Sequence, residues 1–190
     1  MPGMRSLTYY IAVSLDGFIA GPEGQFDFFP FEGNFAATVL ADFPETIPGP
    51  AREPLGLTGV PNKRFDTVVM GRGTYEPGLA AGMTSPYPQL KQFVLSRTLT
   101  ATDPAVDIVA ADPVGLVREL KQQDGLGIWL CGGGKLAAQL RDEIDEIVLK
   151  INPVVLGAGI PLFDGAFRPV RLGLVESRSY DTGTIMATYR

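Results

Sequence analysis

Residues 127–136 constrain the fold most, because they join an apolar run, three consecutive glycines and a helix-like segment. Residues 128–131 carry no charge, as expected of a buried strand. A glycine turn between a strand and a helix lets the backbone approach a phosphate, with the first helical amides directed at it. The stretch therefore predicts a phosphate site, and a tight turn without ligand is the alternative.

Two known nucleotide motifs were compared with this stretch. A P-loop is excluded, because Lys135 is followed by Leu136 where a serine or threonine is needed. Gly132, Gly134 and Ala137 match the G-x-G-x-x-A pattern of dinucleotide-binding folds. The acidic residue that should close the next strand is replaced by the sequence Lys-Ile-Asn at residues 150–152. The pattern therefore favours a dinucleotide turn without its usual ribose ligand.

Composition excludes several classes of function. The net charge of -5 argues against a nucleic-acid surface. The absence of histidine removes typical zinc sites and every Ser-His or Cys-His pair, and we predict no metal. No apolar run is long enough for a membrane span and no signal-peptide layout is present, so we expect a cytoplasmic protein without membrane partners. Catalysis must therefore use carboxylates, lysine, tyrosine, backbone groups or a cofactor.

Strands and helices alternate along the chain and give way to a β-rich end. Apolar runs predict strands at residues 7–13, 65–70, 92–95, 106–110, 128–131 and 144–151, a helix at 113–123, and a hairpin of 172–180 with 184–189. This order predicts one α/β domain over residues 1–190. We expect three α-β-α layers around a mostly parallel sheet with an antiparallel edge.

Residues 25–63 are irregular and rich in phenylalanine, proline and glycine. Phe26, Phe28, Phe29 and Phe31 surround Asp27. This segment is interpreted equally well as a pocket wall or lid and as a satellite hydrophobic cluster. Within it, we predict a short helix capped by Asn34 and ending at residue 43, with residues 35, 39, 40 and 43 on its buried side.

Polar groups follow three of the predicted strands, at the point where each ends. Arg72 and Thr74 follow one strand, Ser96 and Arg97 a second, and the 132–134 glycine turn a third. The carboxyl ends of parallel strands meet at one edge of a sheet, so these groups are expected to converge. Arginine suits a 2′-phosphate, and the set therefore predicts a dinucleotide that carries one. Thr74 is predicted either to cap its helix or to bind phosphate.

Three other residues have competing interpretations. Asp16 lies in a double turn at the end of the first strand, and local chemistry favours hydrogen bonding to its own turn backbone. Cys131 is interpreted as a packed small residue in preference to a reactive thiol. Trp129 is interpreted as core in preference to a substrate platform.

Five stretches, residues 12–20, 69–76, 94–97, 131–136 and 151–163, resemble the dihydrofolate reductase-like superfamily in the order that the family has them. The chain is particularly similar to the reductase domain of bacterial riboflavin biosynthesis and its stand-alone relatives. This resemblance implies an NADPH-dependent reductase that transfers hydride to a small heterocyclic substrate, pteridine-like or pyrimidine-like. Its relatives also suggest a homodimer.

The resemblance also implies a set of site residues. The cofactor set is Ala12, Ile19, Ala20, Gly71, Arg72, Thr74, Leu95, Ser96, Arg97, Gly132, Gly133, Gly134, Lys135 and Leu136. The substrate set is Asp16, Gly159, Pro161, Leu162 and Phe163. Asp16 is the first candidate proton donor or substrate anchor, and Asp27 is the second.

Two other classes stay open at this point. The chain is also compatible with a cofactor-binding module that does not turn over, and with a reductase that uses a flavin or deazaflavin. A zinc deaminase domain, which accompanies the reductase in bifunctional riboflavin enzymes, has no counterpart here because the chain has no histidine.

Overall fold

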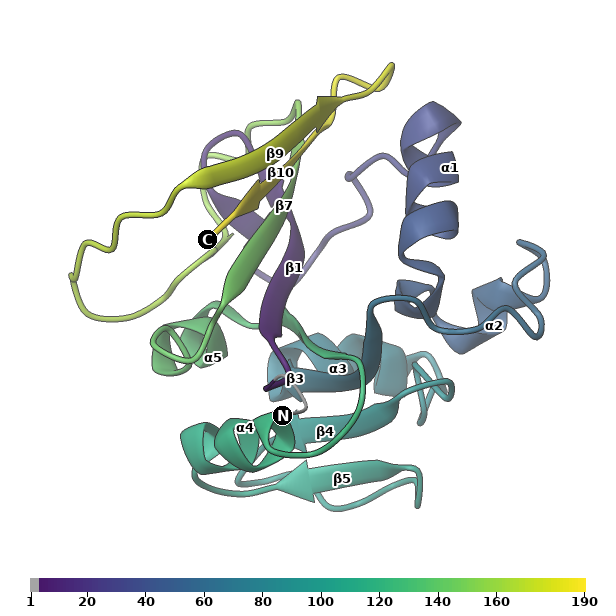
Figure 1. Cartoon of the computed structure of the whole chain (residues 1–190), viewed down its shortest axis with the longest axis vertical. Helices are drawn as coiled ribbons and strands as arrows, with labels where there is room; N and C mark the ends of the chain where they lie inside the picture. Colours follow the sequence, from purple (N-terminus) through teal and green to yellow (C-terminus); the bar gives the residue numbers. More distant parts are fainter. Residues whose placement is uncertain (1–3) are drawn as a thin grey trace.

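The computed structural model describes residues 4–190 and contains an eight-stranded sheet (Figure 1). The strand order is β5-β4-β3-β6-β1-β7-β10-β9. These strands are β1 (Leu7–Ser14), β3 (Phe65–Gly71), β4 (Lys91–Leu95), β5 (Val106–Val109), β6 (Gly127–Gly132), β7 (Glu146–Asn152), β9 (Leu174–Ser179) and β10 (Ile185–Tyr189). All strands from β5 to β7 in this order are parallel, and β10 is antiparallel to both β7 and β9. The predicted parallel sheet with an antiparallel edge is confirmed.

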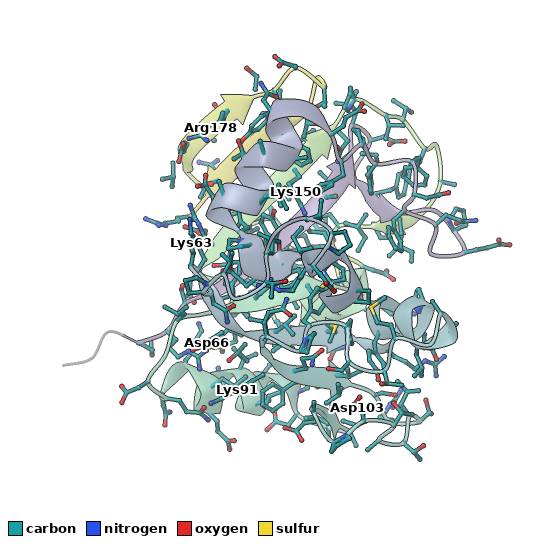
Figure 2. The ribbon with its side chains drawn as sticks, turned by 90° about the vertical axis from the view of Figure 1, so that its right-hand side faces the viewer. Lys63, Asp66, Lys91, Asp103, Lys150 and Arg178 are labelled. Atoms are coloured by element: carbon teal, nitrogen blue, oxygen red, sulfur yellow. The ribbon has the colours of Figure 1, made fainter. Side chains whose placement is uncertain are left out.

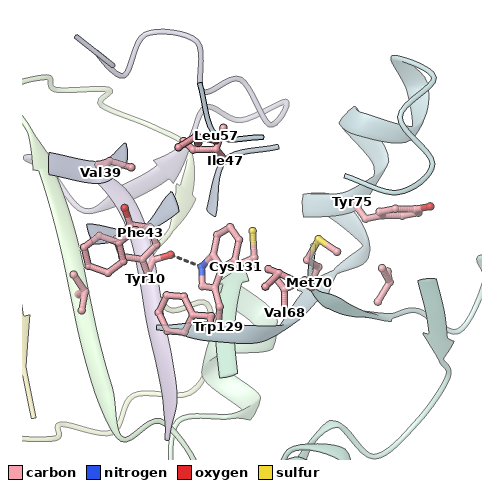
Figure 3. Close-up of a cluster of buried hydrophobic side chains, with 14 of the residues drawn as sticks. Tyr10, Val39, Phe43, Ile47, Leu57, Val68, Met70, Tyr75, Trp129 and Cys131 are labelled. Carbon is pink, nitrogen blue, oxygen red and sulfur yellow. Dashed lines mark hydrogen bonds between the residues drawn. The ribbon is translucent and has the colours of Figure 1, made fainter. Parts of the chain in front are cut away.

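Helices cover both faces of the sheet, which gives the predicted three layers. The helices are α1 (Gly33–Asp42), the 3-10 turn η1 (Pro44–Thr46), α2 (Gly49–Arg52), α3 (Arg72–Ala80), α4 (Pro113–Lys121) and α5 (Gly134–Gln139). One hydrophobic cluster joins Tyr10 and Trp129 of the sheet to residues of α1 and α3 (Figure 3). The second joins Tyr9 to residues of α4 and α5. Tyr9 and Tyr10 enter different clusters because neighbouring strand residues point to opposite faces.

A second, small sheet was not predicted. In it, β2 (Phe18–Ala20) pairs antiparallel with β8 (Ile160–Pro161). The two strands are too short to leave a hydrophobic pattern, and they come from loops that are distant in sequence. Their pairing holds the loop after β1 against the loop after β7, at the carboxyl edge of the parallel strands.

Two capping predictions are wrong. Helix α1 begins at Gly33 with Glu32 at its N-cap position, so Asn34 does not cap it. Asn34 Oδ1 instead accepts a hydrogen bond of 3.1 Å from the amide of Asp181, which ties α1 to the turn of the terminal hairpin. Thr74 lies inside α3, whose N-cap position is Gly71, and therefore does not cap that helix either.

The other local differences are small. Phe35, Val39 and Phe43 are buried as predicted, whereas Leu40 is only partly buried. The terminal hairpin forms around residues 181–183 as expected, and α4 ends two residues before the predicted end. No helix in residues 4–190 has the length and apolar character needed to cross a membrane.

Glu45 in η1 is fully buried, and its side chain binds the backbone of the residues that lead into β3. Its carboxylate accepts hydrogen bonds from the amides of Lys63, Arg64 and Phe65 at 3.2, 2.6 and 2.7 Å. Three backbone donors at the end of a long loop are satisfied by this one side chain. The loop between α2 and β3 is therefore held closed by a charge-assisted contact.

We expect Glu45→Ala to lower the free energy of unfolding by about 3 kcal/mol, because it leaves several amides without an acceptor. Glu45→Gln should lower the free energy of unfolding by less, because the glutamine side chain keeps one oxygen that can accept these hydrogen bonds. Urea denaturation of each variant measures the change, and Glu53→Ala, at an exposed position near the end of α2, is the matched control. An alanine variant within about 0.5 kcal/mol of the wild type would contradict this role.

Candidate functional site

A groove of about 810 Å³ runs along the carboxyl ends of β3, β4, β5 and β6. It is lined by residues from the three strand ends singled out in the sequence, together with the loop after β5 and the loop around β8. In an open parallel sheet this edge is where ligands bind, since every strand delivers its following loop there. The predicted convergence is confirmed for Arg72, Ser96, Arg97 and the turn residues Gly133 and Gly134, whereas Thr74 does not line the groove.

The glycine turn after β6 forms one wall of the groove. Gly133 has a φ of 106°, a backbone conformation that favours glycine. Gly134 begins α5, and a side chain at this position would collide with the carbonyl oxygen of Pro161. The Gly134 carbonyl also accepts a hydrogen bond of 2.9 Å from the amide of Asp164. The turn is thus packed directly against the loop that follows β8.

Cationic side chains stand along the groove. Arg72 donates a 2.8 Å hydrogen bond to Thr98 and forms a 3.1 Å ion pair with Glu76, while about half of its side chain stays exposed. Arg97 and Lys135 are exposed and form no ion pair within residues 4–190. These side chains are free to meet a phosphate that enters the groove.

Two acidic residues and one buried hydroxyl also contribute to the polar lining. Asp112 and Asp164 line the groove together with Ser96. Ser96 Oγ accepts hydrogen bonds from the amides of Thr98 and Leu99 at 3.2 and 3.0 Å. The serine therefore shapes the turn after β4, which carries Arg97 and Thr98.

A second cavity of about 320 Å³ opens further inside, between the sheet and the loop after β2. We call it the inner cavity. Its lining is mostly apolar and aromatic, and includes Phe26 and Phe29 from the phenylalanine-rich loop. The groove and the inner cavity share the lining residues Gly73, Gly133 and Ile160, so they adjoin each other. The interpretation of the loop as a pocket wall is confirmed for these two phenylalanines.

Lys150 is the one charged residue among those that line the inner cavity in the described part of the chain. It lies on β7, and its ammonium sits 4.0 Å from the centre of the Tyr10 ring. Its neighbours across the sheet are Ala12 and Met186, which carry no charge. Burial lowers the pKa of Lys150 to about 8, and the nearby Cys131 opposes this shift.

Three other polar side chains of the inner cavity, those of Tyr87, Cys131 and Trp129, contact protein atoms. Tyr87 Oη lies 3.8 Å from the Cys131 sulfur. Burial raises the pKa of Cys131 to about 12, so the side chain is a thiol at neutral pH. Trp129 donates a 3.0 Å hydrogen bond from Nε1 to the Tyr10 carbonyl (Figure 3). Both residues pack in the core as interpreted, and both also face the cavity.

The fourteen residues predicted to hold a cofactor all line one of these two hollows. The groove takes Gly71, Arg72, Leu95, Ser96, Arg97, Gly133, Gly134, Lys135 and Leu136. The inner cavity takes Ala12, Ile19, Ala20, Thr74, Gly132 and again Gly133. Thr74 thus lies on the inner side, away from its predicted neighbour Arg72. Their roles toward a cofactor stay predictions.

The predicted substrate residues are more dispersed. Gly159 and Pro161 line the groove. The Leu162 carbonyl accepts a 2.9 Å hydrogen bond from Tyr9 Oη, and the Leu162 side chain packs in the second hydrophobic cluster. Phe163 lines a separate hollow beside β7, β10 and the segment that joins α5 to β7. Neither Leu162 nor Phe163 lines the groove or the inner cavity.

Asp16 and Asp27 are exposed and line neither hollow. Asp16 accepts hydrogen bonds from Ser14 Oγ at 2.7 Å and from the amides of Leu156 and Gly157 at 3.1 and 2.7 Å. The Ser14 hydrogen bond, with the two amides, lowers the pKa of Asp16 to about 2. An ionised carboxylate that fixes a distant loop is poorly suited to donate a proton. The catalytic roles of both aspartates stay predictions.

Sequence reasoning missed Lys150, Thr46 and Tyr87, which also line the inner cavity. One signal was available for Lys150, because it is a charge inside an otherwise apolar strand at residues 147–151. Thr46 and Tyr87 lie in irregular segments, and nothing in their local sequence distinguishes them from loop residues.

The chain therefore has the architecture of an α/β protein with a groove at the carboxyl edge of its parallel strands. It belongs to the RibD C-terminal domain family, which matches residues 62–186. A Bacillus subtilis relative, the uncharacterized protein YwjB, is 32% identical over 93% of this chain and 92% of its own length. Another from the same organism, YyaP, is 27% identical over 97% and 94%.

Solved structures agree with this assignment. A putative riboflavin biosynthesis protein from Shewanella sp. PV-4 superposes with a TM-score of 0.73 at 26% identity, over 97% of this chain and 98% of that one. A diaminohydroxyphosphoribosylaminopyrimidine deaminase/5-amino-6-(5-phosphoribosylamino)uracil reductase from Thermotoga maritima gives a TM-score of 0.66 at 16% identity. That match covers 98% of this chain and 56% of the larger protein, and it shows the shared fold.

We expect Asp16→Asn to speed hydrogen exchange at the Gly157 amide, because the neutral side chain is a weaker acceptor. Asp27→Asn, at an exposed position without such contacts, should leave that exchange unchanged. Exchange measured by NMR separates the two variants. Unaltered exchange in Asp16→Asn, together with complete loss of turnover, would instead assign Asp16 to the chemistry.

We expect Lys150→Met to raise the free energy of unfolding by about 2 kcal/mol at pH 7, because it removes a half-buried charge that has no acidic partner within residues 4–190. The unfolded side chain titrates near 10.5 and the folded one near 8, so the wild type gains stability as the pH rises between these values. The difference in free energy of unfolding between the variant and the wild type should therefore become smaller toward pH 10.

Urea denaturation at pH 7 and pH 10 measures this difference. Tyr10, Cys131 and Tyr87 are the other titratable groups at the cavity, and they are common to both proteins. A difference in free energy of unfolding that does not change with pH would contradict the prediction that the Lys150 charge destabilises the folded state. A methionine variant that is less stable than the wild type at pH 7 would contradict it as well.

Proposed function

We propose that this protein is an NADPH-dependent reductase that transfers hydride to a small, flat heterocycle of pyrimidine or pteridine type. Membership of the RibD C-terminal domain family supports oxidoreductase chemistry on a pyrimidine-like compound. The single observation that carries the proposal is that a groove lined by cations adjoins an aromatic inner cavity. Together they match the two chemically different ends of a phosphorylated dinucleotide.

The residues present fit this cofactor. Arg72 and Arg97 offer planar, permanently charged groups for a 2′-phosphate, and Lys135 adds a third cation. Gly133 and Gly134 both line the groove and carry no side chain, so their backbone can face a ligand there. A pyrophosphate needs such a backbone approach, and the neighbouring cations balance its charge.

The inner cavity suits the reacting rings. Ala12, Ile19 and Ala20 give it an apolar wall beside the end of β1, while Phe26 and Phe29 cover it from the loop side. NADPH, when bound, supplies the hydride, and the protein contributes orientation and exclusion of water. An enclosed apolar site strengthens any polar contact made to the acceptor.

We expect NADPH and NADP⁺ to bind more tightly than NADH, because only the phosphorylated pair can use both arginines. Arg72→Ala combined with Arg97→Ala should weaken NADPH binding roughly 10- to 100-fold and leave NADH nearly unaffected. Isothermal titration calorimetry of the folded proteins measures both. Arg171→Ala combined with Arg178→Ala removes the same net charge at exposed positions outside the groove and serves as the control.

Absence of binding to all three nucleotides in folded protein would overturn the proposal. A yellow preparation, or binding of a flavin or deazaflavin in place of NADPH, would assign another redox cofactor. Selective NADPH binding without reduction of any heterocycle tested would favour a binding module without turnover.

A further inference from the structure

The inner cavity contains a cation that its surroundings do not neutralise. The Lys150 ammonium forms no hydrogen bond and no ion pair within residues 4–190, and no acidic residue lines the cavity. In Figure 2 Lys150 lies in the upper half of the molecule, well separated from the exposed Lys91 in the lower half. Lysines are usually exposed or paired, so an unpaired ammonium in an aromatic cavity needs an explanation.

Packing alone does not explain this arrangement. The Tyr10 ring interacts favourably with the ammonium, but a cation–π contact at this distance recovers only part of the lost hydration. Across the sheet, Ala12 and Met186 offer no polar atom from their side chains. Methionine or leucine would occupy a similar volume without placing a charge in this half-buried, largely apolar position. The three amine donors of Lys150 are therefore available to a guest in the cavity.

We propose that Lys150 is the residue that selects the hydride acceptor, by binding an anionic or strongly polarised oxygen on a small planar ring. The inference rests on the proposed function and adds the class of acceptor to it. The aromatic wall formed by Phe26, Phe29 and Trp129 accepts the ring, and the ammonium at one side fixes its orientation. A neutral ring without such an oxygen leaves the ammonium unpaired and binds less well.

The same ammonium can serve the reduction itself. Hydride addition to a ring carbon breaks a π bond and moves its electron pair onto the attached oxygen or nitrogen. Lys150 neutralises that charge and can pass one proton to the atom, while water returns a proton to the amine. Its pKa near 8 keeps the proton present at neutral pH and readily transferred.

The test uses Trp129, which lines the cavity and is the one tryptophan of the chain, as the reporter. Barbiturate and uracil are the probes, because they share a pyrimidine ring but only barbiturate is an anion at neutral pH. Quenching of tryptophan fluorescence gives a dissociation constant for each ring, with and without NADP⁺. The proteins are the wild type, Lys150→Met, Lys150→Arg and the control Lys91→Met.

We expect the wild type to bind barbiturate about tenfold more tightly than uracil. Lys150→Met should abolish this preference, whereas Lys150→Arg and Lys91→Met should keep it. Circular dichroism verifies that each variant is folded, and calorimetry should find NADP⁺ affinity unchanged in Lys150→Met. Equal binding of the two rings by the wild type, no binding of either, or an unchanged preference in Lys150→Met would overturn the inference.

These outcomes separate the inference from the proposed function. Barbiturate selectivity that depends on Lys150 without any NADP⁺ binding would retain the acceptor site and overturn the NADPH reductase. NADP⁺ binding without ring selectivity would retain the cofactor site and overturn the role of Lys150.

Discussion

The position of β6 is the constraint on which the rest of this structure depends. This strand comes late in the chain, yet it lies between β3 and β1 in the middle of the sheet. Its following turn must therefore leave the sheet between two crowded neighbours, and it passes close to Gly71 at the end of β3. Glycines at residues 132–134 make this close packing possible, and the same three glycines line the groove, the inner cavity or both.

Much of the fold could be predicted from sequence because its signals are local. Apolar runs indicate the buried strands, and three consecutive glycines indicate the turn after β6. The position of the groove could be predicted for the same reason. Arg72 and Arg97 directly follow predicted strands, and in a parallel sheet the carboxyl ends of the strands lie at one edge. Contacts between distant segments had no such signal. Asp16 was recognised as a turn residue, but its amide partner Gly157 is 141 residues away. Glu45 likewise meets its partners only through the fold.

The groove and the inner cavity differ in how their charges are arranged, and this difference fixes the orientation of a ligand that occupies both. The groove is open to water and contains both cations and acids, so its charges are screened and adaptable. The inner cavity has one ammonium and an aromatic wall, where a single ion pair is screened far less. A ligand with several phosphates at one end and a flat ring at the other satisfies both environments only in one orientation.

Lys150 also shows how stability and binding oppose each other at such a site. Burying its charge without a partner disfavours the folded state, whereas filling the same position with an apolar side chain would cost little. A guest that brings a negative oxygen supplies the missing partner and recovers this cost as binding free energy. Rings that lack the oxygen recover none of this cost, so the half-buried, unpaired ammonium discriminates between acceptors.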